Sequence, residues 1–104
     1  MNNNPEQKLF PKHKALSSQG ESLELILFHS ETCFFCHRVM QWAQTLEVPL
    51  ILKDTRRDRQ AKKLLVEVGG KRQVPCLFIN GRPLYESADI IEFFKGLVIN
   101  KADL

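Results

Sequence analysis

The sequence has few of the features that mark membrane, secreted or fibrous proteins. None of its apolar runs reaches the roughly 18 to 20 residues that span a bilayer, and the opening MNNNPEQKLFPKHK lacks the apolar stretch of a secretory signal. Gly and Pro number only 5 each among the 104 residues, as in an ordinary globular chain. We therefore expect a single cytoplasmic domain that has no membrane partner.

The sequence also has little net charge. The formal net charge is +3, which is too small to indicate nucleic-acid binding by itself. Basic residues gather between Lys53 and Arg72, but no aromatic side chains alternate with them, as stacking on nucleotide bases would require. We expect no nucleic-acid partner and interpret most of this segment as a solvated helix face.

Cysteine is scarce, and its placement is informative. There are three cysteines, and two of them stand as Cys33-Phe34-Phe35-Cys36. Without an export signal, an odd number of cysteines containing a C-x-x-C pair favours redox or metal chemistry over a structural disulfide framework. The function of the chain is therefore expected at this pair.

The apolar pattern divides the chain into a tail, a domain and a second short tail. Residues 1–22 carry scattered apolar side chains, which predicts a mostly mobile tail with one short helix near residues 11–17. The domain is expected over residues 23–98, followed by a short tail over residues 99–104.

Strand and helix patterns alternate within the domain. We predict, in order, a strand at 23–28, a helix at 35–46, a strand at 48–52, a helix capped by Asp54 or Thr55 that ends at Gly69-Gly70, a hairpin around Asn80-Gly81, and a last helix capped by Ser87. The order β-α-β-α-β-β-α gives parallel first strands and an antiparallel hairpin. The fold class is therefore α/β, with a four-stranded mixed sheet and three main helices in a thioredoxin-like arrangement.

The two cysteines have different expected roles. Cys33 begins the helix, where unpaired backbone N–H groups and the helix dipole stabilise a thiolate, so it is the expected nucleophile. Cys36 lies one helical turn further on and is more buried, so it is expected to close a disulfide with Cys33 and expel a bound partner. Cys76, which enters a strand, is interpreted as a small core residue.

Other interpretations of the pair are open at this point. Cys33-Phe34-Phe35-Cys36-His37 matches the c-type haem attachment pattern, but that attachment needs export. A zinc ion could take Cys33 and Cys36 with Cys76, His29 or His37, but a second ligand pair is missing. Two core cysteines at helical spacing are disfavoured by the place of Cys33 at a helix start. We expect no metal.

Two segments resemble the glutaredoxin family. They are residues 28–38, which hold the C-x-x-C pair, and residues 73–81, which read Gln-Val-Pro-Cys-Leu-Phe-Ile-Asn-Gly. The resemblance implies that Cys33 is the nucleophile and Cys36 the resolving residue. It also implies that Pro75 is a cis-proline facing Cys33, and that the backbone of Val74 pairs with the cysteinyl part of glutathione. An iron-sulfur cluster bridging two chains, known in that family, is left open.

The chain departs from the glutaredoxin pattern at Ser30, Phe34-Phe35, Gln73 and Tyr85-Glu86. Ser30 stands where the family usually has a lysine that contacts a glutathione carboxylate. Lys71 and Arg72, which lie next to the Val-Pro segment, could bind a carboxylate. Tyr85-Glu86 stands where a Gly-Gly turn is usual, and Glu86-Ser87 is similar to the Glu-Ser motif of glutathione transferase N-terminal domains. That similarity implies that Glu86 and Ser87 hold the γ-glutamyl end of glutathione. Because only residues 99–104 follow the last predicted helix, we do not expect the helical second domain of a full transferase.

The expected function is glutathione-dependent thiol-disulfide exchange. Glutathione would be the co-substrate, and the partners would be proteins that carry disulfides or are glutathionylated. We expect the chain to be a monomer. The alternative is a noncatalytic glutathione-binding or protein-interaction module of the same fold.

Overall fold

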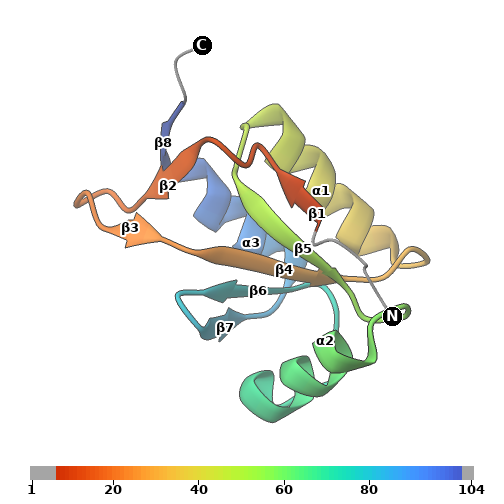
Figure 1. Cartoon of the computed structure of the whole chain (residues 1–104). Coiled ribbons are helices and arrows are strands. Elements are labelled where there is room, and N and C mark those ends of the chain that lie inside the picture. Colours follow the sequence, from red (N-terminus) through yellow and green to blue (C-terminus); the bar gives the residue numbers. More distant parts are fainter. Residues whose placement is uncertain (1–6, 102–104) are drawn as a thin grey trace.

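A five-stranded mixed sheet forms the centre of the computed structural model, which describes residues 7–101 (Figure 1). Its strand order is β1-β5-β4-β6-β7, with only β4 and β5 parallel. The strands are β1 (Gln7–Leu9), β4 (Leu25–His29), β5 (Leu50–Asp54), β6 (Cys76–Ile79) and β7 (Arg82–Leu84). The predicted thioredoxin-like fold is confirmed, with β1 as an additional edge strand.

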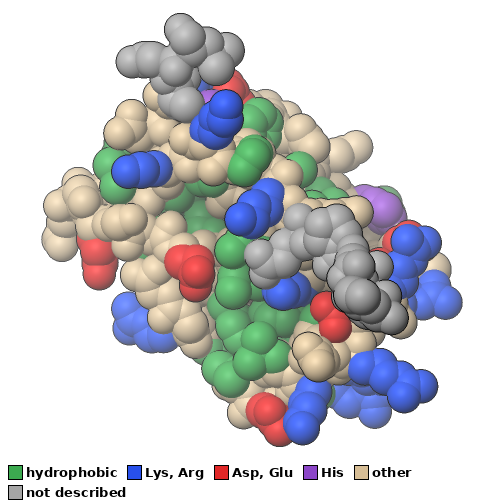
Figure 2. Space-filling model, viewed as in Figure 1, with side chains coloured by type: hydrophobic (Ala, Val, Ile, Leu, Met, Phe, Trp, Pro, Cys, Tyr) green, Lys and Arg blue, Asp and Glu red, His purple; other side chains and the backbone are tan. Residues whose placement is uncertain are grey.

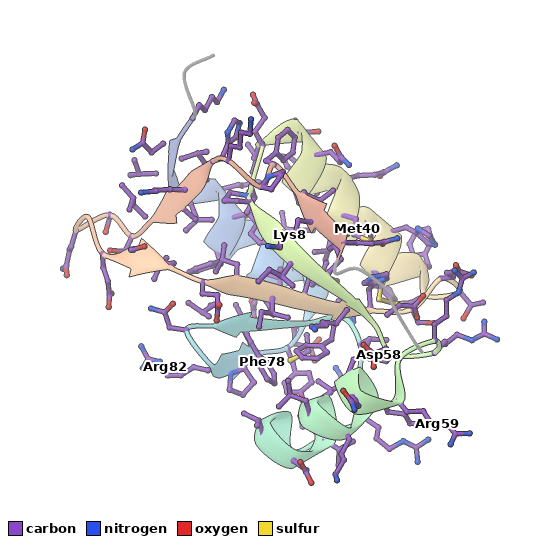
Figure 3. All side chains as sticks on the ribbon, in the orientation of Figure 1. Lys8, Met40, Asp58, Arg59, Phe78 and Arg82 are labelled. Atoms are coloured by element: carbon purple, nitrogen blue, oxygen red, sulfur yellow. A yellow bond between two sulfur atoms is a disulfide. The ribbon has the colours of Figure 1, made fainter. Side chains whose placement is uncertain are left out.

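Helices cover both faces of this sheet. The helices α1 (Phe34–Thr45) and α3 (Ser87–Lys95) pack on one face, while α2 (Arg59–Leu64), continued by the π-helical turn η1 (Leu65–Gly69), packs on the other. Leu27 of β4 faces the α1 and α3 side, and its neighbour Phe28 faces the α2 side, where it lies 4.6 Å from Phe78 between ring centroids. Figure 3 shows Phe78 pointing toward α2. Burial on both faces explains the continuous apolar run of β4.

Two helix caps differ from the predictions. The cap of α2 is Asp58, whose Oδ1 accepts hydrogen bonds from the N–H groups of Gln60 at 3.0 Å and Ala61 at 3.1 Å. Asp54 is the last residue of β5 and Thr55 lies in the loop before α2. The Asp54 carboxylate accepts a hydrogen bond from the N–H of Arg56 at 2.9 Å instead of capping the helix.

The start of α3 was also predicted one residue too late. Glu86 occupies the cap position of α3 with φ of 72° and makes no side-chain capping bond, so Ser87 is the first residue of the helix. A positive φ is unfavourable for a residue with a side chain, so a glutamate is not expected at this position. Serine is a common cap residue, and the cap was therefore predicted at Ser87 instead of Glu86.

The predicted tails are wrong where the structure describes them. Instead of a tail with a helix at 11–17, β1 pairs with β5, and β2 (Lys14–Leu16) joins a second sheet of order β3-β2-β8. Its other strands are β3 (Ser22–Leu23) and β8 (Val98–Asn100), so residues 98–100 are also a strand. Strands of two or three residues are too short to produce an alternating apolar pattern. The parts of the predicted tails at residues 1–6 and 102–104 lie outside the described residues.

Within residues 7–101, no helix is long and apolar enough to cross a membrane.

The second sheet generates a stability prediction. Ala15 of β2 is 2% exposed, whereas its neighbour Lys14 is exposed. We predict that Ala15→Asp lowers the free energy of unfolding by about 3 kcal/mol, because it buries an unpaired charge, and that Lys14→Asp changes it by less than about 1 kcal/mol. Chemical denaturation measures both variants. Equal, small effects of the two substitutions would mean that this segment behaves as a tail.

Candidate active site

The Cys33 sulfur lies at the start of α1. Cys33 is the cap residue, with extended backbone angles, and its Sγ accepts a hydrogen bond from the N–H of Cys36 at 3.1 Å. The preceding turn is closed by the Cys33 N–H, which donates to the Ser30 carbonyl at 3.1 Å. Backbone N–H groups and the positive end of the helix dipole therefore meet at this sulfur, where they stabilise a thiolate. The predicted position of Cys33 at the helix start is confirmed.

Cys33 and Cys36 form a disulfide, with their Cα atoms 5.1 Å apart. Cys36 is completely buried, whereas Cys33 is half-buried. A molecule from solvent can therefore reach the Cys33 sulfur, whereas the Cys36 sulfur contacts Cys33 from the protein interior.

The zinc ligands considered from the sequence do not come together. Within residues 7–101, no three His, Cys, Asp or Glu side chains are grouped so that they could hold a metal ion.

The loop before β6 faces the same sulfur. The Val74–Pro75 peptide bond is cis, as the resemblance implied. The carbonyl oxygen of Val74 lies 3.8 Å from Cys33 Sγ, and Pro75 is buried behind it. The backbone of Val74 is thus placed beside the reactive sulfur.

A groove with basic walls opens beside Val74. It has a volume of about 470 Å³, and its lining contains four cationic side chains and no carboxylate. The lining residues are Ser30, Thr55, Arg56, Arg59, Lys62, Leu65, Arg72 and Val74, and we call this site the basic groove. Lys and Arg side chains gather over α2 in the space-filling view (Figure 2), and Figure 3 shows Arg59 beside Asp58 at the start of that helix. The groove is suited to a carboxylate ligand.

Most of this groove could not be predicted from the sequence. The cations of residues 53–72 were expected on a solvated helix face, because helical charge patterns do not show which cations converge. Of the cations that line the groove, only Arg72 was expected to be able to bind a carboxylate. The sequence feature that indicates an anion-binding site here is the excess of basic over acidic residues in the segment before Val74.

The other predicted glutathione residues lie outside the basic groove. The Lys71 ammonium lies 5.0 Å from the centroid of the Tyr85 ring. The backbone carbonyl of Lys71 accepts a hydrogen bond from the Tyr85 hydroxyl at 3.2 Å. Glu86 is exposed, and Ser87 is half-buried at the start of α3. The structure therefore brings Cys33, Cys36, Val74 and Pro75 together, and it places Lys71, Glu86 and Ser87 around the β7 to α3 connection.

His29 is a buried polar group close in sequence to Cys33. Its side chain is 7% exposed, and Nε2 has no hydrogen-bond partner within the described part of the chain. Burial lowers the pKa of His29, although the nearby Asp54 carboxylate opposes the shift. The ring is therefore neutral at neutral pH.

Cys76 is the third cysteine and is completely buried, as predicted. Burial raises the pKa of its thiol to about 11, against the opposing effect of a hydrogen bond with Tyr85. Cys76 is therefore a neutral core side chain and is not a second nucleophile.

Comparison with known proteins identifies relatives of this arrangement. Residues 32–96 match the family described as "Glutathione S-transferase, N-terminal domain". No curated protein sequence matches the chain significantly.

Among solved structures, similar folds include three glutaredoxins. A wheat glutaredoxin is 27% identical, with 69% of this chain and 71% of that chain covered and a TM-score of 0.57. The holo form of glutaredoxin C1 from Populus tremula x tremuloides is 21% identical over 65% and 70% of the two chains, with a TM-score of 0.55. A glutaredoxin from Methanosarcina mazei Go1 is 14% identical over 89% and 90%, with a TM-score of 0.62.

The state of Cys76 generates a prediction about pH. Its thiol ionises near 9 when unfolded and near 11 when folded. The stabilisation is thus complete below about pH 9 and is lost as pH rises toward about 11. The free energy of unfolding of the oxidised protein is measured at pH about 8 and about 10.5. Its decrease over this interval should be larger by about 2 kcal/mol for the wild type than for Cys76→Ala. The same pH dependence in both proteins would contradict this assignment.

Proposed function

We propose that this chain, which belongs to the glutathione S-transferase N-terminal domain family, is a glutathione-dependent reductase of glutathione mixed disulfides and protein disulfides. The thioredoxin-like fold and the disulfide between Cys33 and Cys36 support thiol oxidoreductase chemistry. The observation that carries the proposal is the position of Cys33 Sγ. It caps α1, contacts the Val74 carbonyl and lies beside the basic groove.

The first step of the proposed reaction is thiol-disulfide exchange. The Cys33 thiolate attacks the glutathione sulfur of a mixed disulfide, a new disulfide forms between Cys33 and glutathione, and the substrate thiolate leaves and takes a proton from water. A second glutathione thiolate then attacks this disulfide, which restores the Cys33 thiolate and releases oxidised glutathione. In the net reaction, the mixed disulfide and one free glutathione become the substrate thiol and oxidised glutathione.

Protein disulfides need both cysteines. After the Cys33 thiolate forms a mixed disulfide with the substrate, the Cys36 thiolate attacks Cys33 Sγ and releases the second substrate thiol. The Cys33–Cys36 disulfide seen in the structure is the product of that step, and two glutathione molecules reduce it again.

Glutathione recognition is proposed to use both sides of Val74. The Val74 backbone would pair with the cysteinyl amide, and the cations of the basic groove, Arg59 and Arg72 among them, would hold a carboxylate in place of the lysine that Ser30 replaces. Glu86 would accept from the γ-glutamyl ammonium, and Ser87 with the α3 N-terminus would hold its carboxylate.

The two cysteines can be separated by activity. We expect Cys33→Ser to abolish all disulfide activity, because it removes the nucleophile. Cys36→Ser should keep reduction of a small glutathione mixed disulfide and lose reduction of a protein disulfide. Glutathione consumption measures the first activity, and insulin reduction measures the second. Equal loss in both variants would contradict the assignment of roles, and no glutathione-dependent turnover in the wild type would indicate a noncatalytic binding module.

The basic groove can be tested with two neighbouring cations. Arg72 lines the groove, whereas Lys71 lies over the Tyr85 ring. We expect Arg72→Ala to raise the KM for glutathione by about threefold to thirtyfold, since a charge-assisted contact contributes from under 1 to about 2 kcal/mol. Lys71→Ala is the matched control and should change KM by less. Steady-state kinetics decide the question, and a larger effect of Lys71→Ala would remove the groove from glutathione binding.

The γ-glutamyl contact has its own test. We predict that Glu86→Gln raises the KM for glutathione several-fold with little change in maximal rate, because the neutral side chain loses its attraction for the ammonium. Glu92→Gln, on the exposed face of the same helix, is the control. If the two variants have the same kinetics, Glu86 is only a surface charge.

A further inference from the structure

Two exposed phenylalanines stand directly beside the nucleophile. Phe34 is 71% exposed and Phe35 is 55% exposed, and they are the two most exposed large apolar side chains among residues 7–101. Their rings contact each other edge to face, with centroids 5.4 Å apart. We call them the aromatic pair. Aromatic surface exposed in this way next to a reactive group marks a place where a partner docks.

Cys33 is next in sequence to the aromatic pair, and its sulfur contacts a residue that lines the basic groove. Phe34 and Phe35 follow Cys33 directly in the first turn of α1, while Val74, which contacts Cys33 Sγ, lines the groove. A glutathione mixed disulfide has two parts, glutathione and the substrate molecule, which extend in different directions from the disulfide bond. If glutathione occupies the basic groove, the substrate molecule lies against the aromatic pair.

The charges around the aromatic pair favour an acidic partner. The first turn of α1 has no acidic side chain, and the exposed Arg38 lies on the next turn, at helical spacing from both rings. The nearest acid in sequence, Glu31, is paired with Arg57 at 2.6 Å. A second copy of this chain would bring the same cations against Arg38 and the basic groove, and their repulsion disfavours that occupant.

We propose that the aromatic pair binds the protein half of the substrate, and that the preferred substrates are glutathionylated proteins whose modified cysteine is flanked by apolar and aromatic side chains, with acidic residues nearby. The inference rests on the proposed function and names its substrate class. During attack by Cys33, the protein sulfur is the leaving group, and its flanking apolar side chains lie on Phe34 and Phe35. Burial of those side chains lowers the barrier without changing the chemistry.

The test compares two synthetic peptides. Both carry one glutathionylated cysteine and have equal length and net charge, but one has Leu and Tyr beside the cysteine and the other has Ser and Thr. The value of kcat/KM is measured for the wild type, for Phe34→Ser/Phe35→Ser and for the control Val98→Ser, which changes an exposed apolar residue of β8. Each value is divided by the rate of the same protein with the mixed disulfide of glutathione and 2-mercaptoethanol, which cancels differences in folding or thiolate reactivity.

We expect the wild type and Val98→Ser to prefer the apolar peptide by about tenfold or more, equivalent to about 1.4 kcal/mol, and the double variant to lose that preference. A wild-type ratio near one, or a ratio that survives in the double variant, would overturn the inference and leave the proposed function intact. No turnover of the small mixed disulfide would overturn both. A dimer that the double substitution dissociates would assign the aromatic pair to self-association instead.

Discussion

The hydrogen bond from the Cys36 N–H to Cys33 Sγ is the contact on which the arrangement of the site depends. It places the sulfur at the start of α1, where the other unpaired N–H groups of the first turn also point. The same contact sets the outward position of Cys33 and the inward position of Cys36. A cysteine that solvent can reach and a second cysteine that it cannot reach are therefore consequences of one helix start.

The rest of the fold brings the backbone of Val74 to that helix start. β4 is buried on both faces and leads into the turn before Cys33, while its antiparallel partner β6 begins just after Val74 and Pro75. The two strands thus hold the Val74 carbonyl at the sulfur from the opposite side. The short helix α2 then adds its cations to the space next to Val74, which gives the site one charged side and, at Phe34 and Phe35, one apolar side.

Features governed by local chemistry could be predicted from the sequence. The apolar run of β4, the periodic face of α1 and the buried Cys76 each follow from patterns within a few residues. The positive φ of Glu86 and the short strands β1 and β2 depend on tertiary contacts instead. The cap at Asp58 is local, but Asp54, Thr55 and Asp58 are all residue types that can cap a helix, so composition did not decide between them. The basic groove was missed for the same reason, because Arg59 and Arg72 are distant in sequence and converge only when α2 folds against the loop before β6.

The central claim is that the start of α1 stabilises a thiolate at Cys33. Its most direct test is an ultraviolet titration of thiolate absorbance in the reduced Cys36→Ser/Cys76→Ala protein, in which Cys33 is the only cysteine. The account predicts a midpoint at least about one pH unit below the value of about 8.5 for an ordinary cysteine. A midpoint at or above that value would contradict it.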